Sequence, residues 1–281
     1  MTLPVFEPFP VDQLRRALRP LSWLASPVAV GLERIPRTGP VLLVGNHTIY
    51  GGLDLATLGL AIYEGTGRHV RGLADHLHYA IPGWRDLLGR LGAVPGSREN
   101  CARLFAAGQP VLVFPGGGRE VNRRKGEAYQ LIWKERIGFA RLAIEHGVPV
   151  VPFASVGVDD MFDVVLDVDD VLASPAGALL RRLGVTKQAW FRGGDAIPSL
   201  SRGRGLLGLP RFERQYFHFS EPIDTARFAG RHQDRSACFA LRKEVEREIE
   251  IGVGAMMAIR DRDPERYPIQ RLLRAAAARL G

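Results

Sequence analysis

The sequence predicts an α/β fold, a single domain with a central, mostly parallel or mixed sheet flanked by helices. Short apolar runs recur along the 281 residues, and segments with helical apolar spacing separate them. Two of these runs, Val41 to Val44 and Val111 to Phe114, lead directly into polar or glycine-rich residues. A residue at the C-terminal end of a buried strand is held still and faces a crevice, so we expect a site where these strands end.

Residues 1–36 are predicted to form an amphipathic helical segment that precedes a domain spanning 37–281. Within this segment, Leu14 to Val30 is rich in apolar residues and carries arginines on its early turns. Pro20 and Pro27 interrupt the helical period. The segment could lie on a membrane surface or pack on the domain, and the pattern favours neither interpretation.

Strands and helices alternate along the rest of the chain. The expected strands are Val41 to Val44, Val70 to Leu73, Gly92 to Val94, Val111 to Phe114, Val148 to Phe153 and Tyr216 to Phe219. The expected helices are Leu55 to Tyr63, Arg98 to Ala107, Glu135 to His146, Arg235 to Arg260 and Tyr267 to Leu280. Asp54 opens the first of these helices, Ser97 is a candidate N-cap and Gly147 suits a C' position.

Residues 193–210 are predicted to form an irregular loop, because glycine, serine, arginine and leucine dominate them. Leu206, Leu207 and Leu209 would suit a lipid-facing lip, although a solvated connection explains them as well. The basic terminal helix could likewise touch anionic lipid or present a solvated face.

Composition limits the partners without choosing among them. The formal net charge is +8, from 38 Lys and Arg against 30 Asp and Glu. This excess favours anionic partners such as phosphorylated small molecules, an acidic membrane surface or nucleic acid, of which nucleic acid is the least expected. Cys101 and Cys238 lie far apart, which argues for a reducing compartment. With no bilayer-spanning apolar run and no signal-like start, we expect an intracellular protein.

The first candidate site follows the strand at Val41. His47 comes directly after Asn46, and six residues that include Gly51 and Gly52 separate it from Asp54. A neutral histidine can take a proton from a hydroxyl, and a nearby carboxylate can orient the ring and stabilise its charged form. His47 and Asp54 are therefore the candidate catalytic pair, with a substrate alcohol in place of the serine of a Ser-His-Asp triad.

The second candidate site follows the strand at Val111. Gly116, Gly117 and Gly118 allow backbone N–H groups to converge on an anion, and Arg119 can add a charged contact to phosphate or carboxylate. The segment lacks the ending of a P-loop and the spacing of a dinucleotide fingerprint, which disfavours nucleoside triphosphates and nicotinamide cofactors.

Three blocks together resemble the glycerolipid acyltransferase (PlsC-like) superfamily: Asn46-His47 to Asp54, Phe114-Pro-Gly-Gly-Gly-Arg-Glu120, and Val151-Pro-Phe-Ala-Ser-Val-Gly157. The resemblance covers about Val41 to Asp160. It implies a glycerol-3-phosphate acyltransferase-like fold, a histidine that deprotonates an acceptor hydroxyl, and attack on the thioester of acyl-CoA or acyl carrier protein. By this resemblance His47 is the base and Asp54 its partner. Asn46, Gly116, Gly117, Gly118, Arg119 and Glu120 are the expected substrate-binding residues.

Two departures from the family pattern bear on the acceptor. The common form places four residues between histidine and aspartate, and its second block reads Phe-Pro-Glu-Gly-Thr-Arg, so Gly116 stands where a glutamate is usual. Of the usual phosphate-binding block, Arg98 alone could serve. The Pro-Gly-Gly-x-Arg-Glu form resembles the branch of diacylglycerol acyltransferase-like proteins and phytyl ester synthases, which implies a neutral lipid alcohol, with a lysophospholipid as the nearest competitor.

Other interpretations of the same residues remain. Water could replace the alcohol, which would make the protein a lipid esterase or thioesterase, or the chain could bind a lipid or nucleotide without catalysis. No metal or other cofactor is expected: His69, His76 and His78 lack a matching ligand pattern. Ser155 misses the nucleophile elbow, and the aspartates from Asp159 to Asp170 are expected to form a solvated face. We expect a cytoplasmic protein peripheral to the inner face of the cell membrane.

Overall fold

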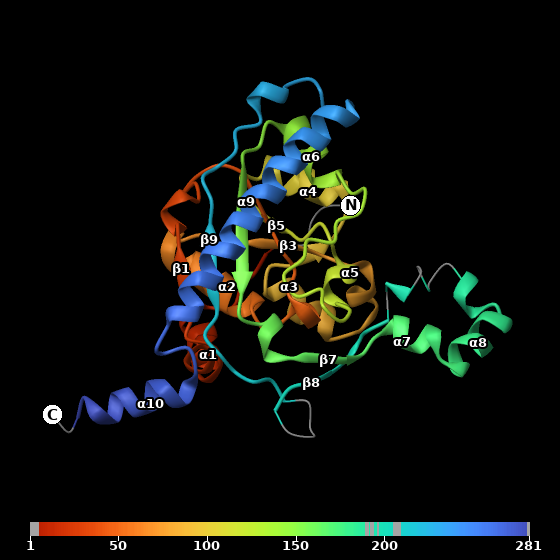
Figure 1. Ribbon diagram of the computed structural model, residues 1–281. Coiled ribbons are helices and arrows are strands. Elements are labelled where there is room, and N and C mark those ends of the chain that lie inside the picture. Colours follow the sequence, from red (N-terminus) through yellow and green to blue (C-terminus); the bar gives the residue numbers. More distant parts are fainter. Residues whose placement is uncertain (1–5, 189–190, 192–193, 196, 205–208, 280–281) are drawn as a thin grey trace.

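A seven-stranded mixed sheet forms the centre of the molecule. The computed structural model describes residues 6–188, 191, 194–195, 197–204 and 209–279. The strand order is β1-β9-β6-β2-β5-β3-β4 (Figure 1). The strands are β1 Val28–Val30, β2 Val41–Gly45, β3 Arg71–Ala74, β4 Val94–Pro95, β5 Pro110–Val113, β6 Val150–Val156 and β9 Tyr216–Phe219. Neighbouring strands pair in parallel except β6 and β9. The predicted α/β class and mostly parallel sheet are confirmed.

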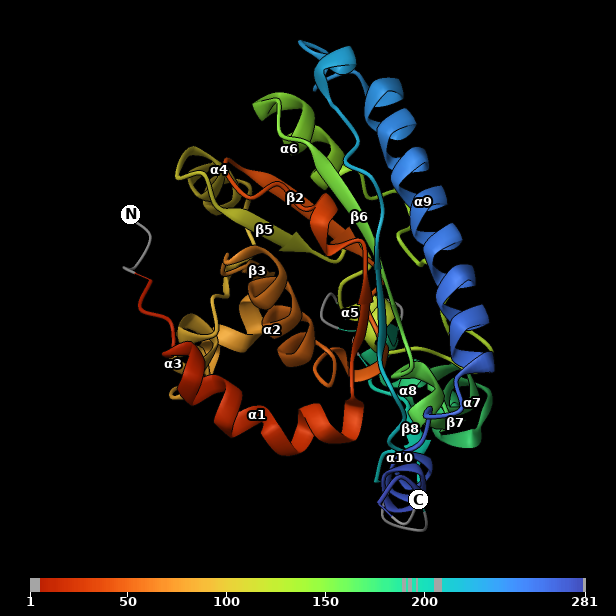
Figure 2. The same ribbon diagram turned by 90° about the vertical axis from the view of Figure 1, so that its left-hand side faces the viewer.

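Helices cover both faces of this sheet (Figure 2). The helices are α1 Val11–Ala25, α2 Leu55–Thr66, α3 Trp84–Arg90, α4 Arg98–Ala106, α5 Gly118–Val121, α6 Gly138–His146, α7 Val168–Ala173, α8 Pro175–Arg182, α9 Arg235–Arg262 and α10 Pro268–Ala277. Residues of α4, α6 and α9 pack with one set of strand side chains in the larger core cluster. Residues of α2 pack with the alternate set in a second cluster. Since side chains of a strand point alternately to its two faces, these clusters are the two layers of an α/β sandwich.

The sheet begins before residue 37. The N-terminal segment contains α1, as expected, but also β1, whose three residues pair with β9 at the sheet edge. A strand of three residues is too short to show the alternation by which strands are recognised in a sequence. Helix α1 continues through Pro20, which was expected to interrupt it. α10 packs on α1, where Arg271 donates to the carbonyls of Trp23 and Leu24 at 2.8 Å each.

One predicted loop contains a strand. β7 Asp163–Leu166 and β8 Leu200–Arg202 form a separate antiparallel pair, so the prediction of an irregular loop over 193–210 is wrong for β8. Both strands lie largely at the surface and therefore lack the apolar alternation of a core strand. Leu206 and Leu207 lie outside the described residues, and Leu209 is exposed.

The helix ends explain how the chain turns toward the site. Ser97 caps α4 by accepting the Asn100 N–H at 3.0 Å, and Gly147 ends α6 with a positive φ of 60°, both as predicted. Asp54 occupies the N-cap position of α2, yet its side chain makes no capping hydrogen bond. The Asp54 carboxylate is instead used in the site at the C-terminal ends of the parallel strands.

Candidate active site

His47 lies two residues beyond β2, at the C-terminal edge of the parallel strands. Its ring stacks on Phe114, which follows β5, with ring centroids 4.1 Å apart and planes 20° from parallel. On another side the ring touches Gly51, where a Cβ would lie 2.6 Å from His47 Cε1. The residue is half-buried, and Nδ1 is buried without a hydrogen-bond partner among the described residues. Nε2 is not among the buried atoms that lack a partner, and a catalytic role for this nitrogen stays a prediction.

Two buried side chains hold the backbone of His47 from opposite sides. The His47 N–H donates to Glu120 Oε2 at 3.2 Å, and the His47 carbonyl accepts from Arg123 Nη2 at 2.7 Å. Glu120 belongs to α5 and Arg123 to the loop that follows it. Both side chains are almost completely buried, so water does not compete for these bonds. The β5–α5 segment thus fixes the position of the histidine that follows β2.

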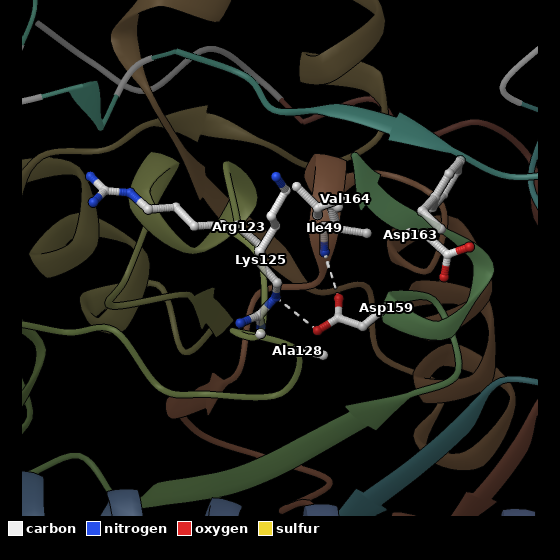
Figure 3. A pocket seen from close by; sticks show the side chains of 10 residues that line it. Ile49, Arg123, Lys125, Ala128, Asp159, Asp163 and Val164 are labelled. Carbon is white, nitrogen blue, oxygen red and sulfur yellow. Dashed lines mark hydrogen bonds and ion pairs between the residues drawn. The ribbon is translucent and has the colours of Figure 1, made fainter. Parts of the chain in front are cut away.

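A buried ion pair supports this arrangement (Figure 3). Arg123 Nε lies 2.7 Å from Asp159 Oδ2, and the side chains are 2% and 1% exposed. Asp159 also accepts the N–H groups of Ile49 at 2.8 Å and Tyr129 at 2.9 Å. Arg123 and Asp159 line a pocket together with Ile49 and residues of 124–128 and 162–164. Arg123 binds the His47 carbonyl and Asp159 binds the Ile49 N–H, so the buried ion pair fixes the loop from His47 to Ile49 at both ends.

Asp54 is completely enclosed and does not hydrogen-bond to His47 in this structure. Its Oδ1 accepts from Thr48 Oγ1 at 3.0 Å and its Oδ2 accepts from Ser155 Oγ at 2.6 Å. Asn46 adds a further link to Ser155, because its amide donates to the Ser155 carbonyl at 2.9 Å and accepts the Ser155 N–H at 2.8 Å. These bonds fasten the end of β2 to β6. A catalytic role for Asp54 and a substrate contact for Asn46 stay predictions.

The titration behaviour of the site follows from burial. Burial lowers the pKa of His47 from 6.5 to about 3, and the charges of Arg123 and His78 act in the same direction. Burial raises the pKa of Asp54, against the hydrogen bonds from Ser155 and Thr48. Burial raises the pKa of Glu120 to about 7, against the N–H groups and the Arg123 charge that favour its ionised form. His47 is therefore neutral at pH 7, as a general base must be before it accepts a proton.

The glycine segment forms a tight turn from β5 into α5. Gly117 has a φ of 50° and Gly118 begins the helix, while Arg136 donates to the Pro115 carbonyl at 2.8 Å. Arg119 is buried and engaged by acids: Nη1 donates to Glu127 Oε2 at 2.8 Å, and Nε lies 3.4 Å from Asp195 Oδ1. An anion-binding role for Gly116, Gly117, Gly118 and Arg119 stays a prediction.

Sequence patterns missed several residues that build this site. Thr48, Arg123 and Asp159 have no motif of their own, and their roles depend on contacts between distant segments. The expectation that the aspartates from Asp159 to Asp170 form a solvated face is wrong for Asp159 and Asp167, which are buried, while Asp163 and Asp169 are exposed. Asp159 pairs with Arg123 inside the protein, and the others pair with arginine or lysine or cap α7. The abundance of arginine was the one available signal, since buried carboxylates require such partners.

Metal binding and membrane insertion both bear on the class of site. Over the part of the chain that the structure describes, no group of three or more His, Cys, Asp or Glu side chains is placed to hold a metal ion. Within the same part, none of the helices combines the length and apolar character needed to cross a bilayer. His76 and His78 lie in the short helix η3 His76–Ala80, and His69 precedes β3.

Comparison with known proteins identifies the class to which this fold and site belong. Residues 27–156 match the family model described as Acyltransferase. The crystal structure of the 1-acyl-sn-glycerophosphate (LPA) acyltransferase PlsC from Thermotoga maritima superposes with a TM-score of 0.50 and 18% identity, and covers 87% of this chain and 79% of that one. At this identity the structural likeness supports the fold.

Curated relatives narrow the class. Phytyl ester synthase 2, chloroplastic, from Arabidopsis thaliana is 33% identical over 89% of this chain and 37% of that protein. The DGAT1/2-independent enzyme synthesizing storage lipids from Homo sapiens is 34% identical over 47% of this chain and 40% of that protein. The chain thus spans less than half the length of these relatives. Residues 27–156 therefore form a domain of the Acyltransferase family, and most of the chain is similar to the phytyl ester synthases.

Proposed function

We propose that this protein is an O-acyltransferase that moves a fatty acyl group from the thioester of acyl-CoA or acyl carrier protein to a lipid hydroxyl. The observation that carries the proposal is a neutral, half-buried histidine at the sheet edge, with its backbone held by Glu120 and Arg123. His47 Nε2 takes the hydroxyl proton as the oxygen attacks the thioester carbonyl. The C–S bond then breaks, and the thiolate leaves with the proton from His47, giving an ester and a free thiol.

Direct transfer, without an acyl-enzyme, is supported by the state of the possible nucleophiles. Ser155 is buried and its hydroxyl donates to Asp54. Cys101 and Cys238 are buried in the core, and burial raises the pKa of Cys101 to about 12 and also raises the pKa of Cys238. A thiol that stays protonated and enclosed is a poor nucleophile.

Asp54 completes the proposed mechanism as the partner of His47. Each carboxylate oxygen has two lone pairs, so the bonds from Thr48 and Ser155 leave Asp54 able to accept one more donor. Because Nε2 must hold a lone pair to act as the base, Nδ1 of the neutral ring carries the N–H, and it has no partner among the described residues. In the proposed mechanism this N–H donates to Asp54 as positive charge develops on the ring, which stabilises the transition state more than the resting enzyme.

A neutral lipid alcohol is the proposed acceptor. The relatives compared above are named for phytyl esters and storage lipids. In this chain Arg119, the arginine of that segment, is already paired with Glu127 and Asp195. An arginine so engaged gives up existing ion pairs before it can bind a phosphate, which favours an uncharged acceptor over a lysophospholipid.

We further propose that the protein works at an anionic membrane surface, on the cytoplasmic side. Figures 1 and 2 place α1, α10 and the β7–β8 pair at one end of the molecule, the end toward which β6 runs. Exposed apolar side chains lie on these elements and on or next to η3 and α3. They are Trp23, Leu77, Ile81, Trp84, Leu87, Leu91, Leu200, Ile269, Leu272 and Leu273. Flotation with phosphatidylglycerol vesicles, compared with phosphatidylcholine vesicles, tests the proposal, and equal or absent binding to both contradicts it.

The activity is tested by product analysis with labelled palmitoyl-CoA. The purified protein meets a panel of long-chain alcohols, mono- and diacylglycerols and lysophospholipids, and the esters are separated. We expect ester formation with the uncharged alcohols, and loss of it in H47A, which should stay folded by circular dichroism. Release of free fatty acid at the same rate with and without alcohol, and no ester, would instead identify a thioesterase. Full transfer activity in H47A would exclude His47 as the base.

A further inference from the structure

Glu120 and Gly116 are matched to one another in a way that the proposed reaction does not by itself explain. A Cβ on Gly116 would lie 2.1 Å from Glu120 Cδ and 2.4 Å from Glu120 Oε2. Real Cβ atoms do not approach other heavy atoms so closely, so the carboxyl group of Glu120 fills the place in which a side chain at 116 would begin. The φ of Gly116 is not among the positive values, so lack of space, not backbone geometry, requires glycine there.

The same carboxyl group links two segments that are distant in the chain. Oε2 accepts the N–H of His47 at 3.2 Å, and Oε1 accepts the N–H of Ile132 at 2.9 Å. Glu120 is completely buried, and these two backbone donors satisfy one oxygen each. Without this carboxyl group, two buried N–H groups would lose their acceptor and gain no hydrogen bond to water in exchange. The carboxyl group therefore sets where the backbone of His47 can lie.

We infer that Glu120 is the positioning residue for His47, and that a carboxyl group at this place can be supplied from position 120 or from position 116, but not from both. The inference rests on the proposed role of His47 as the base. In this chain the carboxyl group comes from position 120, on α5, and glycine at 116 leaves the space that it fills.

The geometry indicates which exchange should work. A carbon one bond beyond Cβ lies about 1.5 Å from it, comparable with the 2.1 Å that separates the Cβ position at 116 from Glu120 Cδ. Aspartate at 116 therefore brings a carboxyl group close to the present one, and glutamate reaches the same region with a folded rotamer. The test compares E120A, G116D, the exchange variants G116D/E120A and G116E/E120A, and E135A. Glu135 is exposed and pairs only at the surface with Arg235, so E135A is the matched control.

We expect kcat of E120A to fall by about 10- to 100-fold, because small displacements of a catalytic group have effects of this size, with little change in KM for palmitoyl-CoA. G116D should fold poorly, since two carboxyl groups compete for one buried place. At least one exchange variant should recover most of the lost kcat, and E135A should match the wild type. E120Q replaces E120A if the latter does not fold: its amide oxygen can accept one N–H, while its NH2 group faces the other donor, so an intermediate kcat is expected.

A readout independent of activity separates this inference from the proposed function. The backbone amide of His47 is followed by NMR chemical shift and hydrogen exchange. Faster exchange in E120A, restored in an exchange variant, supports the positioning role even if the wild type transfers no acyl group. Unchanged kcat and His47 amide exchange in E120A would overturn the inference. Folded exchange variants that are no better than E120A in either measurement would overturn the equivalence of positions 116 and 120.

Discussion

The ion pair of Arg123 and Asp159 offers the sharpest test of how the site is held together. R123M removes the guanidinium but keeps an apolar stem of similar reach. It deletes the 2.7 Å contact to Asp159 and three hydrogen bonds to the carbonyls of His47, Glu127 and Gln130. Removing one partner from a buried pair leaves an uncompensated charge and costs about 3–5 kcal/mol. This is a large share of the roughly 5–15 kcal/mol by which proteins are stable.

Equilibrium unfolding in urea, followed by far-ultraviolet circular dichroism, measures the loss. R124M is the matched control, because Arg124 pairs with Asp169 at the surface, where such a pair contributes about 0–1 kcal/mol. R123M/D159N should be more stable than R123M alone, since asparagine removes the stranded charge and still accepts one of the N–H groups of Ile49 and Tyr129. Equal and small losses in R123M and R124M, with unchanged m-values, would refute the conclusion that this pair holds the His47 loop.

Two further predictions concern the ring of His47 and its titration. G51A should lower transfer activity by about 10-fold or more, because its Cβ would displace the ring. Gly67 also has a positive φ, but a Cβ there would meet no neighbouring atom, so G67A should lose about 1–2 kcal/mol of stability and keep its activity. Equal transfer activities of G51A and G67A would contradict the contact between Gly51 and the His47 ring. Between pH 3 and 6.5 the unfolded chain binds a proton at His47 that the folded chain does not, so this histidine makes stability rise with pH. Between pH 4.5 and 7 the folded chain holds a proton on Glu120, which makes stability fall as pH rises. Relative to the wild type, unfolding free energies of H47Q should therefore rise less steeply with pH and those of E120Q more steeply, by up to about 1.4 kcal/mol per pH unit; parallel curves would refute both shifts.

The strands of the core could be predicted because burial leaves a strong local signal. Val41 to Val44 and Tyr216 to Phe219 are apolar runs in the sequence and strands in the structure. β1 and the β7–β8 pair were missed for two different reasons: β1 has only three residues, and β7 and β8 lie at the surface without a buried face. Strand recognition from sequence depends on a buried face long enough to show a period.

The site was predictable to the extent that its residues lie next to strand ends. His47 follows β2 and the glycines follow β5, and the structure brings Phe114 and Gly51 against the His47 ring. The partners of the polar groups were not predictable in this way. Hydrogen-bond partners leave no repeating pattern in a sequence. The sequence therefore could not distinguish whether Asp54 would bond to His47 or to Thr48 and Ser155.

Glu120 illustrates why a motif alone is a weak guide to which acid does what. In the sequence, Gly116 is a departure from the common form, and Glu120 is a further residue of the same segment. In the structure they are one feature, because the glycine provides the space that the acid fills. The two positions lie four apart in the sequence, on either side of the turn at Gly117, so their contact depends on the β5–α5 turn rather than on either residue type. It follows that substitutions at 116 and 120 should be strongly non-additive, as expected for residues that share one buried space.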